Sequence, residues 1–294
     1  MENDSKKVVS TCPACGSGQT EFSFKKNGFD LYECRRCRHR FVYPVSYDAH
    51  SLYDSDYFVG AKKGSGYVDY DKDKEPMRPA FAEYLKRIEG VVPEKGILLD
   101  VGAATGFFMR IAEGRGWKTK GLEISTYATE VARNNGLDVQ CGILEDSNFA
   151  EQSFDVVSMW DVLEHFADPE ASIRAVARLL KKDGILAINT PDGGSLYARL
   201  MGNRWHLLVP PEHINYFTKK SITLFLEGNG FSVEKISKIG KSFTLEYILQ
   251  TMSTWQQSRE LQKVTDFLKR HPKVGRISIP INLYDNMFVI ARRR

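Results

Sequence analysis

The sequence predicts a doubly wound α/β fold with a mostly parallel sheet, preceded by a small metal-binding module. Three observations support this prediction. Short apolar runs alternate with segments of helical periodicity between residues 97 and 189. A glycine-containing turn follows the first run, and four cysteines form two Cys-x2-Cys pairs near the N-terminus. Strands that alternate with helices pair in parallel, because each helix returns the chain to the same end of the sheet.

The expected elements follow in chain order. Strands are expected at 97–101, 118–123, 137–141, 154–160 and 184–189. Helices are expected at 79–88, 107–113, 126–135, 169–180 and 219–227. Asp168 and Pro169 supply an N-cap and a first-turn proline for the fourth helix. The stretch 241–270 also has apolar residues at helical spacing, which predicts a cover for the core or a face for a homodimer.

Composition excludes several classes of protein. The chain has 294 residues, of which 42% are hydrophobic and 27% charged, values typical of a globular protein with a sizeable core. The net charge of +4 does not indicate a strong polyanion binder. No apolar run approaches the roughly 20 residues of a transmembrane helix, and the first residues lack a signal-peptide core. We therefore expect a cytoplasmic protein without membrane contact.

The cysteines predict a structural zinc site. Cys12-x2-Cys15 and Cys34-x2-Cys37 are separated by 18 residues, which is the two-knuckle spacing of a zinc ribbon. Asn27-Gly28 supplies a hairpin turn that brings the two pairs together. Four thiolates complete a tetrahedral zinc site and leave no open position for chemistry. A redox-active cysteine pair is the alternative interpretation.

Three zones of unequal length are expected. Residues 1–44 form the zinc ribbon, and residues 45–90 form a connector rich in Tyr and Asp. The connector is either a lid over a substrate or a packing element, and its charged run 69–76 is interpreted as an exposed connection. Residues 91–294 form the main domain, with insertions at 190–217 and 241–280.

A ligand site is expected where the first strand of the main domain ends. The turn runs from Asp100 through Gly102 to Gly106 and opens the following helix. Glycines at this point let a ligand approach the backbone, and open α/β sheets bind nucleotides at this edge. Glu123 ends the second strand, where a carboxylate can accept hydrogen bonds from ribose hydroxyls. These features together predict an adenosine-containing ligand.

Several motifs in order resemble one protein family. The segments LLDVGAATGFF, GLEIS, FDVVSMWDVLEHFADP and LLKKDGILAINTP are similar to the successive motifs of class I S-adenosylmethionine-dependent methyltransferases. The similarity is strongest to the group with a V-L-E-H signature, of the methyltransferase domain 23/11 type, over residues 96 to about 240. DNMFVIARR resembles the last, antiparallel strand of that family. The resemblance implies a Rossmann-like methyltransferase sheet.

The resemblance also implies which residues bind S-adenosylmethionine. They are Asp100, Gly102, Ala103, Gly106, Glu123, Ile124, Ile143, Leu144, Trp160 and Asp161. The first glycines would surround the amino-acid part of the cofactor, Glu123 would hold the ribose, and residues 142–144 would line the adenine. Two features depart from the family pattern. Ala104 replaces a glycine of the turn, and Ile143 and Leu144 occupy the stretch near the adenine where the family often has an acidic residue. An NAD-dependent dehydrogenase is the alternative, although its usual G-x-G-x-x-G turn is absent.

Histidines are the candidate catalytic residues. Methyl transfer to a hydroxyl requires alignment, exclusion of water and removal of a proton, so a base is expected rather than a nucleophile. His213 lies in the 190–217 insertion, and His165 belongs to the V-L-E-H motif. Either one can instead be a packing or substrate-orienting residue. Tyr216 and Asp161 are further candidates for the base.

Two classes of acceptor remain open. The family resemblance favours a small molecule, such as a sugar, a sugar nucleotide or a secondary-metabolite precursor, with O-methylation as the broader prediction. The alternative is an RNA- or protein-directed methyltransferase in which the zinc ribbon recruits the substrate. The basic cluster from Arg35 to Arg40 could contact phosphate, although a solvated loop on the metal module is the favoured interpretation.

Overall fold

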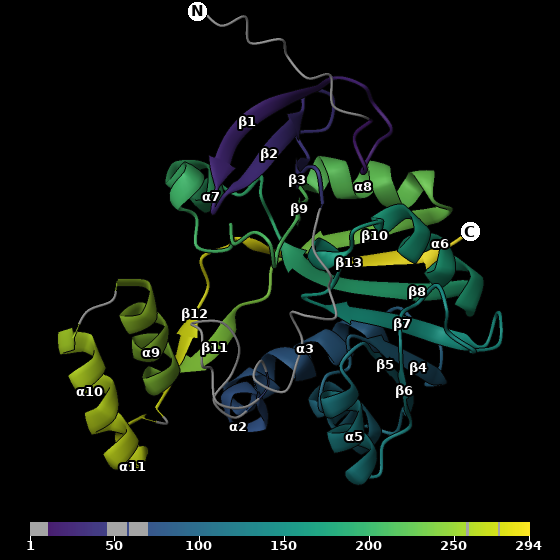
Figure 1. Ribbon diagram of the computed structural model, residues 1–294. Helices are drawn as coiled ribbons and strands as arrows, with labels where there is room; N and C mark the ends of the chain where they lie inside the picture. The colour runs from purple at the N-terminus through teal and green to yellow at the C-terminus, as the bar shows by residue number, and fades with distance from the viewer. Residues whose placement is uncertain (1–10, 46–57, 59–69, 257–258, 276) are drawn as a thin grey trace, which may run out of the picture. The chain divides into compact units, whose positions relative to one another are not determined.

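The computed structural model describes residues 11–45, 58, 70–256, 259–275 and 277–294 (Figure 1). The chain divides into two compact units, each built from separate stretches. The first unit comprises Met1–Tyr47, Leu144–Lys238 and Tyr284–Arg294, and the second comprises Asp48–Ile143 and Ile239–Leu283. Among the described helices, none is long and apolar enough to cross a membrane.

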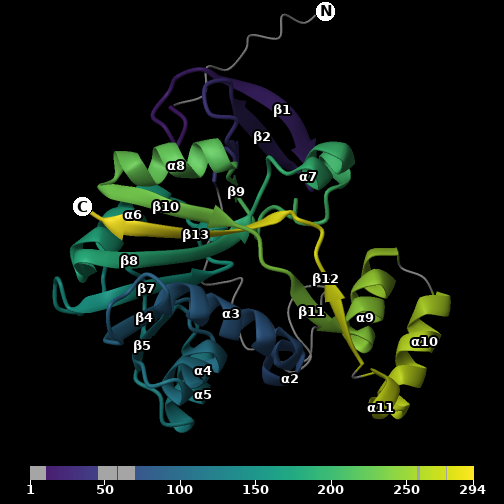
Figure 2. The same ribbon diagram turned by 180° about the vertical axis from the view of Figure 1, so that it is seen from behind.

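Four strands lie side by side in the first unit. β7 (Phe154–Trp160) pairs in parallel with β8 (Leu180–Pro191), with Val157 opposite Leu186. β13 (Asn286–Arg293) runs antiparallel to β8, and β10 (Phe231–Ser237) runs antiparallel to β13 (Figure 2). The long helices of this unit are α6 (Pro169–Leu179) and α8 (Lys219–Gly228). The short helices are η3 (Leu163–His165), α7 (Leu196–Met201) and η4 (Gly202–Arg204).

Three parallel strands form the core of the second unit. β4 (Ile97–Val101) pairs with β5 (Lys118–Glu123), and β5 pairs with β6 (Val139–Cys141). The helices α3 (Arg78–Glu89), α4 (Phe107–Gly114) and α5 (Thr126–Asn134) accompany them. The pairings are therefore parallel among β4, β5 and β6 and between β7 and β8, whereas the last strand, β13, is antiparallel to its neighbours. The predicted fold class is confirmed.

Local side-chain caps explain where the helices begin. Asp168 accepts a hydrogen bond from the Ala171 N–H at 3.0 Å, at the start of α6. Thr218 accepts one from the Ser221 N–H at 3.1 Å and forms a capping box for α8. Such caps satisfy backbone donors that have no partner inside the helix. The helix that was expected to begin at residue 169 therefore begins there.

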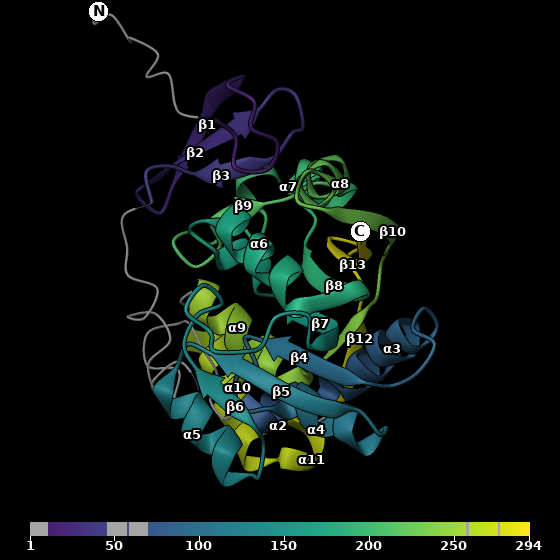
Figure 3. The same cartoon turned by 90° about the vertical axis from the view of Figure 1, so that its right-hand side faces the viewer.

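The cysteine-containing segment forms a small sheet in the first unit. β1 (Thr20–Lys26) and β2 (Phe29–Cys34) make a hairpin, and β3 (Arg40–Val42) pairs with β2. Asn27 and Gly28 have φ angles of 50° and 86°, so the predicted turn is confirmed. The fourth strand of this sheet, β9 (Asn215–Tyr216), belongs to the 190–217 insertion and pairs with β3 (Figure 3).

Two stretches differ from the expected elements. Residues 241–244 do not extend the expected helix, because β11 (Lys241–Thr244) pairs with β12 (Ser278–Ile281). Helices α9 (Leu245–Gln256), α10 (Arg259–Arg270) and α11 (Pro272–Gly275) follow β11 in the second unit. The charged run 69–76 is also partly helical, with α2 (Tyr70–Lys74) and η2 (Glu75–Met77). In the 45–90 connector, residues 46–57 and 59–69 lie outside the described residues.

Candidate active site and cysteine centre

The turn after β4 has a backbone conformation that favours glycine. Gly102, Ala104 and Gly106 have φ angles of 72°, 49° and 80°. A Cβ atom at Gly106 would lie 2.0 Å from Leu137 Cδ1, so the Leu137 side chain would have to move to accommodate it. The turn therefore brings its backbone close to α5 and β6, and it begins α4 directly after Gly106.

The Glu123 carboxylate closes this turn against the end of β5. It accepts hydrogen bonds from the Ala104 N–H and the Ser125 N–H, each at 2.8 Å. The residue is 5% exposed, and burial raises its pKa above the ordinary value. A carboxylate oxygen can accept more than one hydrogen bond, so Glu123 retains capacity for ribose hydroxyls.

The other sequence-predicted residues of this unit lie at or just after the ends of β4, β5 and β6. Asp100 is a buried residue next to the end of β4, and Ala103 is buried within the turn. Ile124 directly follows β5, and Ile143 is 38% exposed after β6. The donor set consists of two buried carboxylates, Asp100 and Glu123, together with backbone and apolar side chains. This set fits an adenosine-type cofactor such as S-adenosylmethionine.

Asp71, which was not predicted from the sequence, binds this turn from another element. It lies on α2 and accepts hydrogen bonds from Thr105 Oγ1 at 2.5 Å and from Arg110 Nη2 at 2.8 Å. Arg110 also donates to the Thr105 carbonyl at 2.9 Å. Asp71 precedes its partners by 34 and 39 positions, and a charged run carries no local signal that selects this partner.

The remaining predicted cofactor residues lie in the first unit. Trp160 ends β7 and stacks on Phe288, with ring centroids 6.0 Å apart. Asp161 has a φ of 57°, and its Oδ1 accepts a hydrogen bond from Asn189 Nδ2 at 2.6 Å. Leu144 is buried. The Asn189 contact holds the Asp161 side chain at the carboxyl end of β7, where ligands of such sheets bind.

The two candidate catalytic histidines lie against each other in the first unit. The ring centroids of His165 and His213 are 4.8 Å apart, with an interplanar angle of 78°. His165 Nδ1 donates to the Glu212 carbonyl at 2.6 Å, and His213 Nδ1 donates to the Leu207 carbonyl at 2.8 Å. Since both Nδ1 atoms carry a proton, Nε2 is the basic nitrogen of each neutral ring.

A buried carboxylate joins this pair. Glu164 is fully buried and accepts a hydrogen bond from Thr190 Oγ1 at 2.9 Å. One ligand atom from each of Glu164, His165 and His213 lies within 4.8 Å of the others, a spacing that a bound cation could use. Desolvation lowers the pKa of His165 below its usual value. The imidazole of His165 is therefore mostly neutral at pH 7.

A second buried polar group, also missed from the sequence, lies around Asp285. This carboxylate accepts a hydrogen bond from Trp205 Nε1 at 2.9 Å, and His206 Nε2 lies 3.7 Å from it. Trp205 belongs to the same insertion as His213. Asp285 directly precedes β13, so it fastens the insertion to the end of the sheet within this unit.

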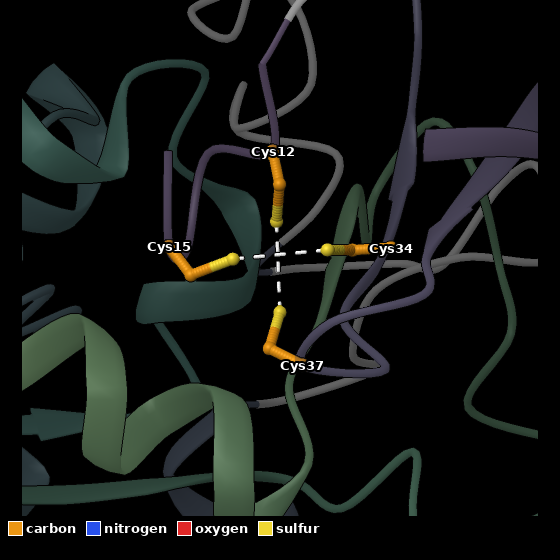
Figure 4. A group of neighbouring side chains, drawn as sticks. All are labelled: Cys12, Cys15, Cys34 and Cys37. Atoms are coloured by element: carbon orange, nitrogen blue, oxygen red, sulfur yellow. Dashed lines mark hydrogen bonds between the residues drawn. The ribbon is translucent and has the colours of Figure 1, made fainter. Parts of the chain in front are cut away.

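The four cysteines converge on one point (Figure 4). The Sγ atoms of Cys12 and Cys37 are 3.7 Å apart, as are those of Cys15 and Cys34. Tetrahedral zinc with Zn–S bonds of about 2.3 Å requires S–S separations of about 3.8 Å. Burial raises the pKa of Cys15 to about 11, so a cation is needed to keep its thiolate at neutral pH. The donor set fits a zinc ribbon.

The fold agrees with the comparison to known families. The chain matches the family model of a methyltransferase domain over residues 74–236, more than half of its length. It therefore belongs to this family. Within it, the chain is of the class I, S-adenosylmethionine-dependent type, with an N-terminal four-cysteine cluster.

Relatives support the same assignment. The ubiquinone biosynthesis O-methyltransferase of Neisseria meningitidis serogroup A / serotype 4A is 33% identical over 132 residues, or 42% of this chain and 53% of the relative. The chain thus spans about half the length of the curated relatives it matches. The YcgJ protein of Bacillus subtilis superposes with a TM-score of 0.52 at 17% identity, covering 72% of this chain and 98% of that one. A Pyrococcus horikoshii OT3 protein superposes with a TM-score of 0.51 at 15% identity, covering 85% and 100%. These two likenesses concern the fold alone.

Proposed function

We propose that the protein transfers a methyl group from S-adenosylmethionine to a hydroxyl of a small molecule. The observation that carries this proposal is the His165–His213 pair, whose tautomers present basic Nε2 atoms beside a buried carboxylate. The name of the Neisseria relative, an O-methyltransferase, agrees with a hydroxyl acceptor. Sugars, sugar nucleotides and secondary-metabolite precursors are the acceptors that the resemblance suggests.

The proposed roles follow from the chemistry of methyl transfer. When bound, S-adenosylmethionine supplies an electrophilic methyl group on a sulfonium. Asp100, Glu123 and the turn between them bind and orient that cofactor. His213 or His165 would accept the hydroxyl proton on Nε2 as the acceptor oxygen bonds to the methyl carbon and the methyl–sulfur bond breaks, with neutral S-adenosylhomocysteine as the leaving group. A neutral base of this kind contributes roughly 10²–10⁴-fold to rate.

The full set of proposed cofactor residues is the one named from the sequence. It comprises Asp100, Gly102, Ala103, Gly106, Glu123, Ile124, Ile143, Leu144, Trp160 and Asp161. The proposed zinc ligands are Cys12, Cys15, Cys34 and Cys37. We also propose the domain limits of 1–44, 45–90 and 91–294, with the zinc ribbon in a structural role.

The charges of the ribbon favour a small acceptor over a nucleic acid. Arg35 pairs with Glu21, while Arg38 and Arg40 both pair with Glu33. His39 is fully buried and does not face solvent. Three of the basic side chains that suggested a phosphate contact are therefore already paired with carboxylates, which weakens a polyanion site.

Methyl-labelled S-adenosylmethionine tests the proposal directly. The protein is incubated with it and with cell extract separated into small-molecule, RNA and protein fractions. Label is expected in the small-molecule fraction, and its release as methyl iodide on treatment with hydriodic acid would show that the methyl group is on oxygen. Label in RNA or protein instead would contradict the proposal.

Variants of the histidine pair test the assignment of the base. His213→Gln and His165→Gln are each compared with His271→Gln, since His271 also donates Nδ1–H to a backbone carbonyl. We expect a loss of about 10²-fold or more in kcat for one member of the pair, and none for His271. A bound divalent transition metal that both histidine variants lose would show instead that Glu164, His165 and His213 hold a cation.

A further inference from the structure

Asn215 lies where the cysteine-containing sheet meets the 190–217 insertion. It belongs to β9, in which it pairs with Phe41 of β3, so its backbone extends the ribbon sheet. The residue is 3% exposed. Its position in the first unit places one amide side chain between the ribbon and the turn that holds His165.

The Asn215 side chain makes one hydrogen bond to the ribbon and one to the backbone that follows His165. Its Oδ1 accepts from His39 Nε2 at 3.3 Å, on the ribbon side. Its Nδ2 donates to the Phe166 carbonyl at 2.7 Å, directly after His165. A buried amide that uses both its donor and its acceptor fixes the separation of the two groups it joins.

The neighbouring backbone repeats this connection. The Ile214 N–H donates to the Glu164 carbonyl at 3.0 Å, and the Ile214 carbonyl accepts from the Val42 N–H at 2.9 Å. One peptide segment is thus hydrogen-bonded to the ribbon on one side and to residues 163–166, which include His165, on the other. Thr218 Oγ1 adds a bond to the carbonyl of Cys37, a proposed zinc ligand, at 3.1 Å.

Apolar packing joins the same two parts. Leu31 and Val42 of the ribbon share one buried cluster with Trp205, Leu208 and Ile214 of the insertion. At the end of this cluster, Tyr216 donates its hydroxyl to the His213 carbonyl at 2.6 Å. The ribbon and the histidine-bearing insertion therefore share a core instead of meeting through a polar surface.

We propose that the four-cysteine module supports the wall of the acceptor site, and that Asn215 is the positioning residue that connects them. This inference rests on the proposed function only in identifying the site beside His165 and His213 as the acceptor site. The contacts between the ribbon and the insertion do not depend on it. It gives the ribbon a role in holding His165 and His213, in place of the recruitment of a macromolecular substrate.

Histidine NMR gives the direct test. Long-range ¹H–¹⁵N spectra of the full chain report the tautomer and environment of each imidazole without any substrate. In Asn215→Ala, the signals of His165 and His39 should both move, with the global fold retained. The matched control is Asn229→Ala, which removes an Asn side chain that donates to the Phe225 carbonyl on α8. It should leave both signals unchanged.

A second pair of variants keeps the test decisive if Asn215→Ala fails to fold. His39→Leu removes the donor to Asn215, while His39→Gln retains an N–H group of similar reach. The His165 signal should shift in His39→Leu and return to its wild-type position in His39→Gln. An unshifted His165 signal in a folded Asn215→Ala or His39→Leu protein would overturn the proposal.

Kinetics separate this inference from the proposed function. With the labelled acceptor, Asn215→Ala should lower kcat or raise the acceptor KM at least tenfold, while the Kd of S-adenosylmethionine stays within twofold. If no small molecule is labelled, the proposed function fails, yet the NMR outcome still decides whether Asn215 positions His165. Equal losses in the Asn229→Ala control would attribute the effect to general destabilisation and overturn the proposal.

Discussion

At the scale of single residues, backbone conformation decides which side chains the turn after β4 accepts. Gly106 combines a φ of 80° with a neighbour 2.0 Å from an added Cβ. Ala104 tolerates a φ of 49° because its methyl group packs with Phe58 and Ala128. The replacement of a family glycine by Ala104 thus retains the turn at the cost of some backbone strain.

Gly106→Ala should destabilise the protein by roughly 2–4 kcal/mol, since it adds both a strained φ and a clash with Leu137. Urea denaturation measures this change. The control is Gly114→Ala in α4, where nothing lies within 4 Å of the added carbon. That variant should be neutral or stabilised by about 0.5 kcal/mol, and equal losses in both variants would contradict the prediction.

Glu123→Ala should weaken S-adenosylmethionine binding at least tenfold in calorimetric titration. It removes the carboxylate proposed to hold the ribose and also deprives two backbone N–H groups, of Ala104 and Ser125, of their acceptor. The lost acceptors should cost about 1–3 kcal/mol of stability. Glu130→Ala, an exposed position on α5, is the control. Unchanged affinity in Glu123→Ala would refute the assignment.

The pH dependence of kcat should report His165 or its partner. Desolvation lowers the pKa of His165, so the ring is neutral at and above pH 6.5. If His165 is the base, the rate is flat above pH 6.5 and falls once the pH drops below the lowered pKa. The stability that comes from the neutral ring is likewise present above pH 6.5 and lost toward lower pH. If the decrease in kcat at low pH is unchanged in His165→Gln, His165 is excluded as the base.

At the scale of elements, helix starts were predictable because their caps are local in sequence. Asp168 lies three positions before the N–H that it caps, so a short motif carries the whole signal. β11 was missed for the opposite reason. Its four residues become a strand only because Ser278–Ile281 pair with them, and the helical periodicity that follows extended the prediction across 241–244.

Asp168→Ala should lower the free energy of unfolding by about 1 kcal/mol, because α6 loses its N-cap. Thermal and urea unfolding measure the change. Asp146→Ala, at an exposed loop position, provides the comparison and should stay within about 0.5 kcal/mol of wild type. No difference between the two variants would show that the cap contributes nothing to stability.

At the scale of the whole molecule, the cysteine module is tied to its unit by hydrogen bonds and a shared core. Loss of the proposed zinc ion should therefore perturb the structure beyond the ribbon, in the segments 163–166 and 213–218. This consequence does not follow from the cysteine spacing, which predicts only a metal site and the hairpin.

Cys34→Ser should reduce bound zinc and accelerate hydrogen exchange in β1–β3 and in β9. The cause is the coupling of metal binding to folding, since Cys34 is fully buried among the four sulfurs. Cys141→Ser, outside the cluster, should retain the metal and the exchange rates. Freshly purified protein without zinc would contradict the assignment of the metal.

Local patterns were enough to predict the alternating strands and helices, the turn from Asp100 to Gly106, the Asn27–Gly28 hairpin and the cysteine cluster. Each depends on residues close together in the chain, whose spacing is set by helix, strand or turn geometry. The contacts of Asn215 could not be predicted in this way. His39 and Asn215 are 176 positions apart, and Asn215 and Phe166 are 49 apart. Only the packing of the ribbon against the insertion brings these groups within hydrogen-bond distance, because burial selects partners that sequence spacing does not encode.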